Sequence, residues 1–207
     1  MRMKTPSATK TAGVEVYSKI PIPMTGRDDL GLYFHIPFCA KKCPYCHFFV
    51  MSGVDKHLDA YMQALKREWD MRLPQIESRP IDSIYLGGGT PTQLPAQDLA
   101  EIISWIPKSP TCEITIEANP DDVTHELISY LAEAGVNRLS IGVQSLAPDS
   151  LIQIGRTHTA NRAVEAIKTA YQAGIENITI DLMYDLPGQT LESFQKTLDQ
   201  LDSLPIS

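Results

Sequence analysis

Residues 32–46 read LYFHIPFCAKKCPYC, an apolar and aromatic run that leads directly into three cysteines. The run before the first cysteine has the composition of a short buried strand. Cys39, Cys43 and Cys46 follow with the spacing C-x3-C-x2-C. Three thiolates are one fewer than a cubic four-iron cluster needs, so a cluster bound by them keeps one iron without a protein ligand. We therefore predict an iron–sulfur centre in the loop after the first strand.

Two other uses of these thiols are weighed against a cluster. Structural zinc takes four ligands, usually in two separated pairs, and His47 is the candidate fourth ligand. It adjoins Cys46, however, and adjacent ligands strain a tetrahedral site. A disulfide is disfavoured, because four cysteines in 207 residues without a recognisable signal peptide indicate a reducing compartment. A zinc-binding structural module remains the alternative, and Cys112 is expected to be a small buried residue.

Composition indicates a soluble globular protein. Hydrophobic residues make up 43% of the chain, which is enough for a core, and the net charge of -7 argues against a nucleic-acid binder. No apolar run approaches the roughly 18 residues of a membrane span, and we expect a cytoplasmic protein. Residues 1–29 are basic, hydroxylated and not periodic, so we expect a flexible N-terminal arm. A transit peptide shares this bias but should be richer in arginine.

From residue 30 onward, strand patterns alternate with helix patterns. Strands are predicted over residues 31–36, 81–86, 113–117, 137–143 and 177–183, and helices over 55–73, 96–105, 124–134, 161–173 and 191–201. Pro74 is expected to end the first helix, and residues 204–207 to begin a sixth strand. Such alternation builds right-handed β-α-β units on a parallel sheet. The fold class is therefore α/β.

The position of the unusual residues favours a barrel over a doubly wound sheet. They follow the carboxyl ends of all five predicted strands, where β/α barrels place their sites. A doubly wound sheet usually gathers its ligands at one crevice. We predict a partial barrel with about five β/α units.

Six segments of the chain together resemble a known family. In chain order they are LYFHIPFCAKKCPYC, YLGGGTPTQL, ITIEANPDD, NRLSIGVQS, IGRTH and DLMYDLPGQT. The series resembles the radical S-adenosylmethionine (SAM) superfamily, and within it the oxygen-independent coproporphyrinogen III oxidases and the haem chaperones of the HemW type. The resemblance implies a (β/α)6 radical SAM barrel. Residues 30–207 would form an incomplete core that lacks its C-terminal part.

The resemblance also implies a site. Cys39, Cys43 and Cys46 match the ligands of a [4Fe-4S] cluster whose open iron binds SAM, and Tyr45 matches the aromatic platform for its adenine. The residues matched to cofactor contacts are Tyr33, Gly88, Gly89, Thr90, Glu117, Gln144, Arg156 and Asp181. In the oxidase, the positions of the last three contact a second SAM molecule. Each residue alone has an ordinary structural explanation, but their shared order favours the cofactor site.

The resemblance leaves two functions open. The cysteine pattern typical of the oxidases is C-x3-C-x2-C-x-C. Phe48 stands at the position of their fourth cysteine, which favours the chaperones. His47 departs from the aspartate usual in the chaperones. A chaperone would bind haem and transfer it to an acceptor protein, whereas an oxidase would decarboxylate a porphyrinogen after reductive cleavage of SAM. Either function implies a reductant protein as electron donor.

Overall fold

A computed structural model describes residues 30–76 and 79–207, and the arm predicted for residues 1–29 lies outside them. The described residues form one parallel sheet in the order β1-β2-β3-β4-β5. Its strands are β1 (Leu30–Ile36), β2 (Ile81–Gly88), β3 (Glu113–Ala118), β4 (Arg138–Gln144) and β5 (Asn177–Leu182). The predicted α/β class with five strand–helix units is confirmed, and the sheet is not closed into a full barrel.

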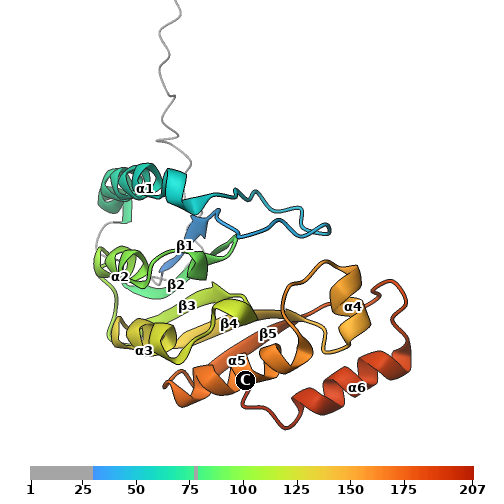
Figure 1. The fold of residues 1–207 in the computed structure, drawn as a ribbon. Coiled ribbons are helices and arrows are strands. Elements are labelled where there is room, and N and C mark those ends of the chain that lie inside the picture. The colour runs from blue at the N-terminus through green and yellow to red at the C-terminus, as the bar shows by residue number, and fades with distance from the viewer. Residues whose placement is uncertain (1–29, 77–78) are drawn as a thin grey trace, which may run out of the picture.

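Helices follow each strand; most of them cover the outer side of the curved sheet, and α4 lies beyond its carboxyl edge (Figure 1). They are α1 (Val54–Ile76), α2 (Ala96–Ser104), α3 (His125–Glu133), α4 (Pro148–Gln153), α5 (Ala160–Gln172) and α6 (Leu191–Leu201). Two short 3-10 turns, η1 (Pro91–Gln93) and η2 (Pro120–Asp122), follow β2 and β3. Threonine N-caps set the starts of three helices: Thr124, Thr159 and Thr190 each accept a backbone N–H bond.

Alternation along the strands gives the sheet two different faces. On β3 and β4, Ile114, Ile116, Leu139 and Ile141 are buried in one core with apolar residues of the helices. The residues that alternate with them are polar, apart from Gly142, and lie on the opposite face. The helices therefore cover the apolar face, and the concave polar face is available for a site.

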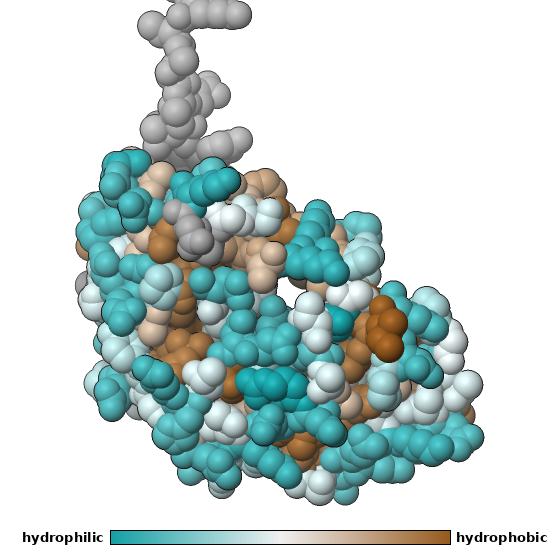
Figure 2. All heavy atoms as spheres, viewed as in Figure 1, coloured by the Kyte–Doolittle hydropathy of each residue, from teal (hydrophilic) through white to brown (hydrophobic). Residues whose placement is uncertain are grey.

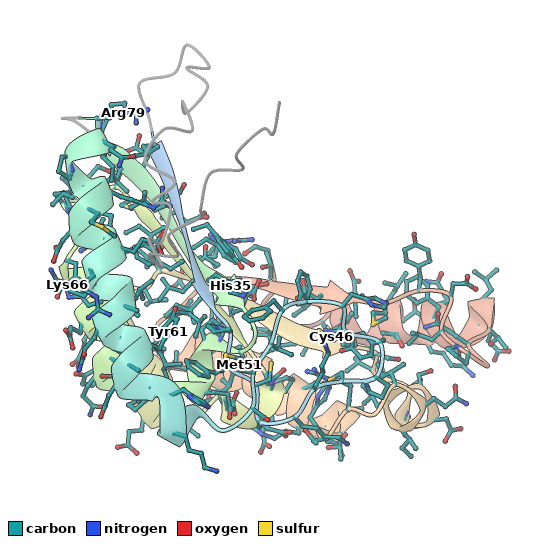
Figure 3. All side chains as sticks on the ribbon, turned by 90° about the horizontal axis from the view of Figure 1, so that it is seen from above. His35, Cys46, Met51, Tyr61, Lys66 and Arg79 are labelled. Atoms are coloured by element: carbon teal, nitrogen blue, oxygen red, sulfur yellow. The ribbon has the colours of Figure 1, made fainter. Side chains whose placement is uncertain are left out.

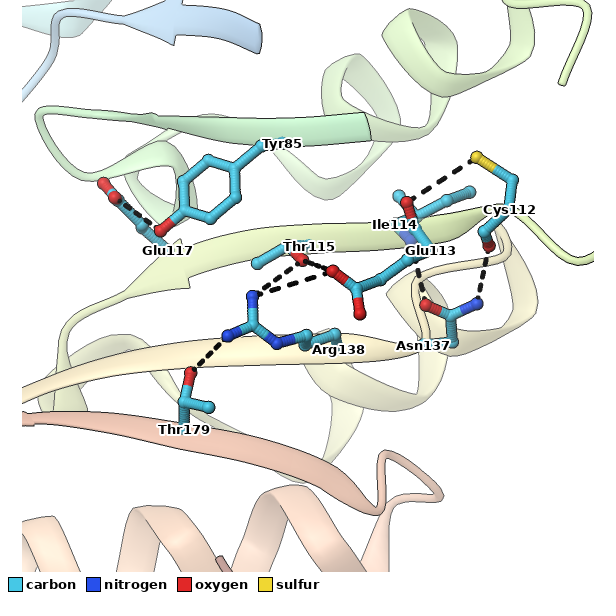
Figure 4. Close-up of polar contacts among 9 residues, drawn as sticks. All are labelled: Tyr85, Cys112, Glu113, Ile114, Thr115, Glu117, Asn137, Arg138 and Thr179. Atoms are coloured by element: carbon cyan, nitrogen blue, oxygen red, sulfur yellow. Dashed lines mark hydrogen bonds and ion pairs between the residues drawn. The ribbon is translucent and has the colours of Figure 1, made fainter. Parts of the chain in front are cut away.

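The amino-terminal half of the polar face is held by Arg138 of β4, which bridges its two neighbouring strands (Figure 4). Its guanidinium donates to Thr115 Oγ1 of β3 at 3.2 Å and to Thr179 Oγ1 of β5 at 3.1 Å. Glu113 lies 3.8 Å from the same guanidinium. These contacts tie three strands together below the carboxyl ends that carry the site.

Some predicted boundaries were wrong. The first helix does not end at Pro74 but continues to Ile76 with the proline inside it. The short helix α4 and both 3-10 turns were not predicted. Residues 204–207 form no strand, although Ser207 N donates to Ile178 O of β5 at 2.8 Å. Cys112 is buried, as predicted.

Candidate functional site

The three cysteines lie on a loop whose base is closed by backbone hydrogen bonds. Cys39 N donates to Met51 O at 2.9 Å, and Met51 N donates to Pro37 O at 2.6 Å. Phe38 anchors the base because its buried ring meets the edge of Tyr61 on α1, with centroids 5.2 Å apart. Figure 3 shows Met51 and Tyr61 beside the end of β1, with Cys46 further out on the loop. The loop is thus fixed at its base and reaches over the sheet.

The glycines after β2 fix the same loop from the other side. Gly89 N donates to Ile36 O at 2.8 Å, and Thr90 N donates to Phe38 O at 2.7 Å. A Cβ at Gly89 would lie 2.5 Å from Phe38 O and 2.9 Å from Ile36 O. Only glycine therefore lets β2 approach the start of the cysteine loop this closely.

A cavity of about 690 Å³ opens at the carboxyl ends of the strands, between the cysteine loop and the polar face. Figure 2 shows the surface hollowed in this region, and Figure 1 shows the loop after β1 extending toward α4. Its lining residues are Cys39, Lys41, Cys43, Tyr45, Cys46, His47, Phe48, Val50, Gly88, Gly89, Thr90, Glu117, Ala118, Asn119, Ser140, Gly142, Gln144, Arg156, Asp181 and Met183. Every strand from β2 to β5 contributes to the wall.

Arg156, in the segment after α4, joins the cysteine loop to the strand ends. One terminal nitrogen, Nη2, donates to Asn119 Oδ1 at 2.8 Å and to Gly142 O at 2.7 Å. The other, Nη1, lies 3.8 Å from Cys43 Sγ and donates to it. Its Nε is buried and has no hydrogen-bond partner among the described residues. A buried donor without a partner is costly, so this N–H is available for a ligand acceptor.

Glu117 is held by donors to both of its carboxylate oxygens. The Tyr85 hydroxyl donates to Oε1 at 2.8 Å, and Gly88 N donates to Oε2 at 2.9 Å. Figure 4 shows the first of these contacts between β2 and β3. Burial, together with the bond to Glu117, raises the pKa of Tyr85 to about 12, so the phenol remains a donor at neutral pH. The carboxylate is fixed at the cavity wall.

Gln144 and Asp181 complete the wall on β4 and β5. Gln144 has a φ of 67°, which a residue with a side chain rarely adopts, and Met183 N donates to its carbonyl at 2.9 Å. Such backbone strain is often found at functional sites. Asp181 lines the cavity, and partial desolvation there raises the pKa of its carboxyl above the usual 3.8.

The three loop thiols and Arg156 form a donor set suited to a cluster and an anionic ligand. All three loop thiols are half-buried and line the cavity, and burial raises the pKa of Cys39. Within residues 30–76 and 79–207, no three His, Cys, Asp or Glu side chains converge closely enough to hold a single metal ion. A four-iron cluster is a larger group, whose thiolate ligands bind different irons and do not converge on one point. Three thiols beside a buried Arg156 Nε fit a cluster together with an anionic ligand.

The structure brings together most of the predicted site. The three cysteines line one cavity with Gly88, Gly89, Thr90, Glu117, Gln144, Arg156 and Asp181. Tyr33 does not: its side chain is 57% exposed, bonds His35 Nδ1 at 3.2 Å and stacks on Tyr85 outside the lining. Sequence reasoning missed Asn119, Ser140, Gly142 and Met183. Asn119 and Met183 directly follow β3 and β5, whereas Ser140 and Gly142 lie within β4 and alternate with its buried apolar residues, and these positions were the available signal.

Comparison with known proteins agrees with this arrangement. The Radical SAM superfamily matches residues 33–201. The chain is 40% identical over 178 residues to the heme chaperone HemW of Lactococcus lactis, covering 84% of this chain and 46% of that protein. HemW of Escherichia coli is 38% identical over 169 residues, with coverages of 79% and 44%. The chain therefore spans about half the length of these relatives.

A solved structure is also similar. Coproporphyrinogen III oxidase HemN of Escherichia coli matches with a TM-score of 0.78 and 31% identity, over 86% of this chain and 43% of that one. No helix in the described part of the chain has the length and apolarity needed to cross a bilayer.

Proposed function

Since this chain belongs to the radical SAM superfamily, we propose that it is the cofactor-binding core of a haem chaperone. The superfamily uses a [4Fe-4S] cluster and SAM. The observation that carries the proposal is the placing of three half-buried thiols on one cavity with the strand-end residues from β2 to β5. HemW proteins as relatives at 38–40% identity support the chaperone assignment.

Each part of the wall has a distinct task in this proposal. Cys39, Cys43 and Cys46 hold the cluster, which when bound supplies the electron that cleaves a sulfonium bond. Glu117, fixed by its two donors, accepts from the amino group of SAM at the glycine edge. The unpartnered Nε of Arg156 is a donor for its carboxylate. The cysteine loop shields the cavity from water.

A second candidate function is that of a coproporphyrinogen oxidase. The structural similarity to HemN favours it. Phe48, 68% exposed on the cysteine loop, stands where the oxidases have their further cysteine and favours the chaperone. In this proposal the protein has two partner proteins, a reductant that supplies electrons and an acceptor that receives haem.

Anaerobic reconstitution with iron and sulfide tests the cluster. Changing Cys39, Cys43 or Cys46 to Ala should abolish the brown cluster absorbance, whereas Cys112→Ala is the matched control and should retain it. Stoichiometric zinc without a cluster would favour the structural zinc module instead.

Two assays distinguish the chaperone from the oxidase. Retention of haem and its transfer to an acceptor, without conversion of coproporphyrinogen, is the expected result. Conversion to protoporphyrinogen in the presence of SAM and a reductant would replace the chaperone assignment by the oxidase.

A further inference from the structure

The Thr90 hydroxyl lies between the amide of Asn119 and the sulfur of Cys39. Asn119 Nδ2 donates to Thr90 Oγ1 at 3.1 Å, and Thr90 Oγ1 lies 3.6 Å from Cys39 Sγ. Thr90 is only 5% exposed, so bulk water does not compete for its hydroxyl. Asn119 was not among the residues matched to the cofactor site.

Arg156 fixes the direction of every hydrogen bond in this series. A guanidinium has donors and no acceptor, so Asn119 turns its oxygen toward Arg156 Nη2, 2.8 Å away. The amide NH2 then faces Thr90 and donates to it. Because Thr90 Oγ1 accepts from Asn119, its own proton is free to be donated to Cys39 Sγ.

The same arginine also reaches the second cysteine directly. Arg156 Nη1 donates to Cys43 Sγ at 3.8 Å. Two of the three loop sulfurs therefore accept hydrogen bonds from Arg156 itself or from the series of bonds that begins at this partly buried cation. Hydrogen bonds to cluster sulfurs help set the reduction potential, because they stabilise the more electron-rich reduced state.

We propose that Asn119 is a positioning residue that aims the Thr90 hydroxyl at Cys39 Sγ and so raises the reduction potential of the cluster. The inference rests on the proposed function, since it takes Cys39 and Cys43 as cluster ligands. A merely structural role, joining β2 to β3, would change stability and leave the potential of the loaded protein where it was.

The test is the midpoint potential of the reconstituted cluster, followed by electron paramagnetic resonance in a redox titration without SAM. Thr90→Val removes the hydroxyl and keeps the shape, and should shift the potential to more negative values. Thr90→Ser retains the hydroxyl and should keep the wild-type potential. Thr92→Val is the matched control, because Thr92 is also buried but bonds Asp122 instead.

Asn119→Asp tests the orientation itself. The aspartate still accepts from Arg156 but has no donor for Thr90, so the hydroxyl turns to the carboxylate and away from Cys39. The negative charge of the new aspartate also lowers the reduction potential. Asn119→Asp in the Thr90→Val background measures this charge effect alone, because no hydroxyl is left to turn. Asn119→Asp should therefore shift the potential more in the protein with Thr90 than in the protein with Val at position 90.

The outcomes separate the inference from the function on which it rests. Equal shifts in the two backgrounds, or a Thr90→Val potential equal to that of Thr92→Val, would overturn the positioning role of Asn119. Should Thr90→Val fail to load, Thr90→Ala, which also lacks the hydroxyl, replaces it in both comparisons, and the same two equalities would overturn the proposal. If the wild-type chain forms no cluster, the proposed function itself fails.

Discussion

Gly89→Ala should detach the glycine edge of β2 from the cysteine loop. A Cβ at this position would lie 2.5 Å from Phe38 O and 2.9 Å from Ile36 O, both backbone atoms that cannot rotate away. The two carbonyls accept from Gly89 N and Thr90 N, and both bonds must lengthen or break. At about 0.5–1.5 kcal/mol for each, the free energy of unfolding should fall by about 1–3 kcal/mol.

Urea denaturation followed by circular dichroism measures this loss, and iron and sulfide analysis after reconstitution measures the site. Since Cys39 directly follows Phe38, we expect Gly89→Ala to load much less cluster than the wild type. Gly174→Ala is the control: Gly174 has a φ of 101° but nothing within 4 Å of its Cβ position. That variant should lose about 1 kcal/mol through backbone strain alone and load normally. Full loading of Gly89→Ala at unchanged stability would refute the close-approach argument.

Three further predictions concern the core, the wall and a buried histidine. Ile116→Ala removes a side chain with 0% exposure and should cost about 2–5 kcal/mol in urea denaturation, with no effect on the ratio of iron to folded protein. Tyr85→Phe keeps the ring but removes one of the two donors to Glu117, and should weaken SAM binding to the loaded protein in titration calorimetry by less than the about 1.5–3 kcal/mol that a hydrogen bond to a charged group is worth. Burial, and then the charge of Arg156, lower the pKa of His158 below 6.5, so the unfolded chain binds its proton more readily than the folded one. Stability should therefore be complete above pH 6.5 and fall as the pH drops below it, and His158→Gln should flatten that dependence.

The fold followed from the sequence wherever a local pattern was strong. β3 alternates apolar and polar residues over Glu113–Ala118, and Thr124 caps α3 as its position before an apolar period predicts. Pro74 removes one backbone N–H donor from α1, and the helix ends only two residues later at Ile76, so the proline marks the end of the helix to within one turn. Helix α4 has only six residues, too few for a periodic signal.

The sequence predicted which strand ends carry the site, but not which side chains contact one another there. Cys39, Glu117 and Asp181 line one cavity, because the carboxyl ends of parallel strands meet at one edge, and their role in binding a cofactor stays a prediction. Asn119 escaped notice, since an asparagine before a proline is an ordinary turn residue in sequence. Only the distances to Arg156 and Thr90 show that it joins them. Tyr33 matched a family position, yet here it stacks on Tyr85 outside the lining.

The strictly sequential strand order has a consequence for how the molecule matures. Each strand pairs with the one synthesised just before it, so a nascent chain can add units one by one as it leaves the ribosome. The thiols emerge with the earliest unit, whereas Asp181 on the opposite wall emerges with the latest. During translation the thiols are therefore exposed to oxidants and stray metals, and iron delivery is best timed after β5 has docked.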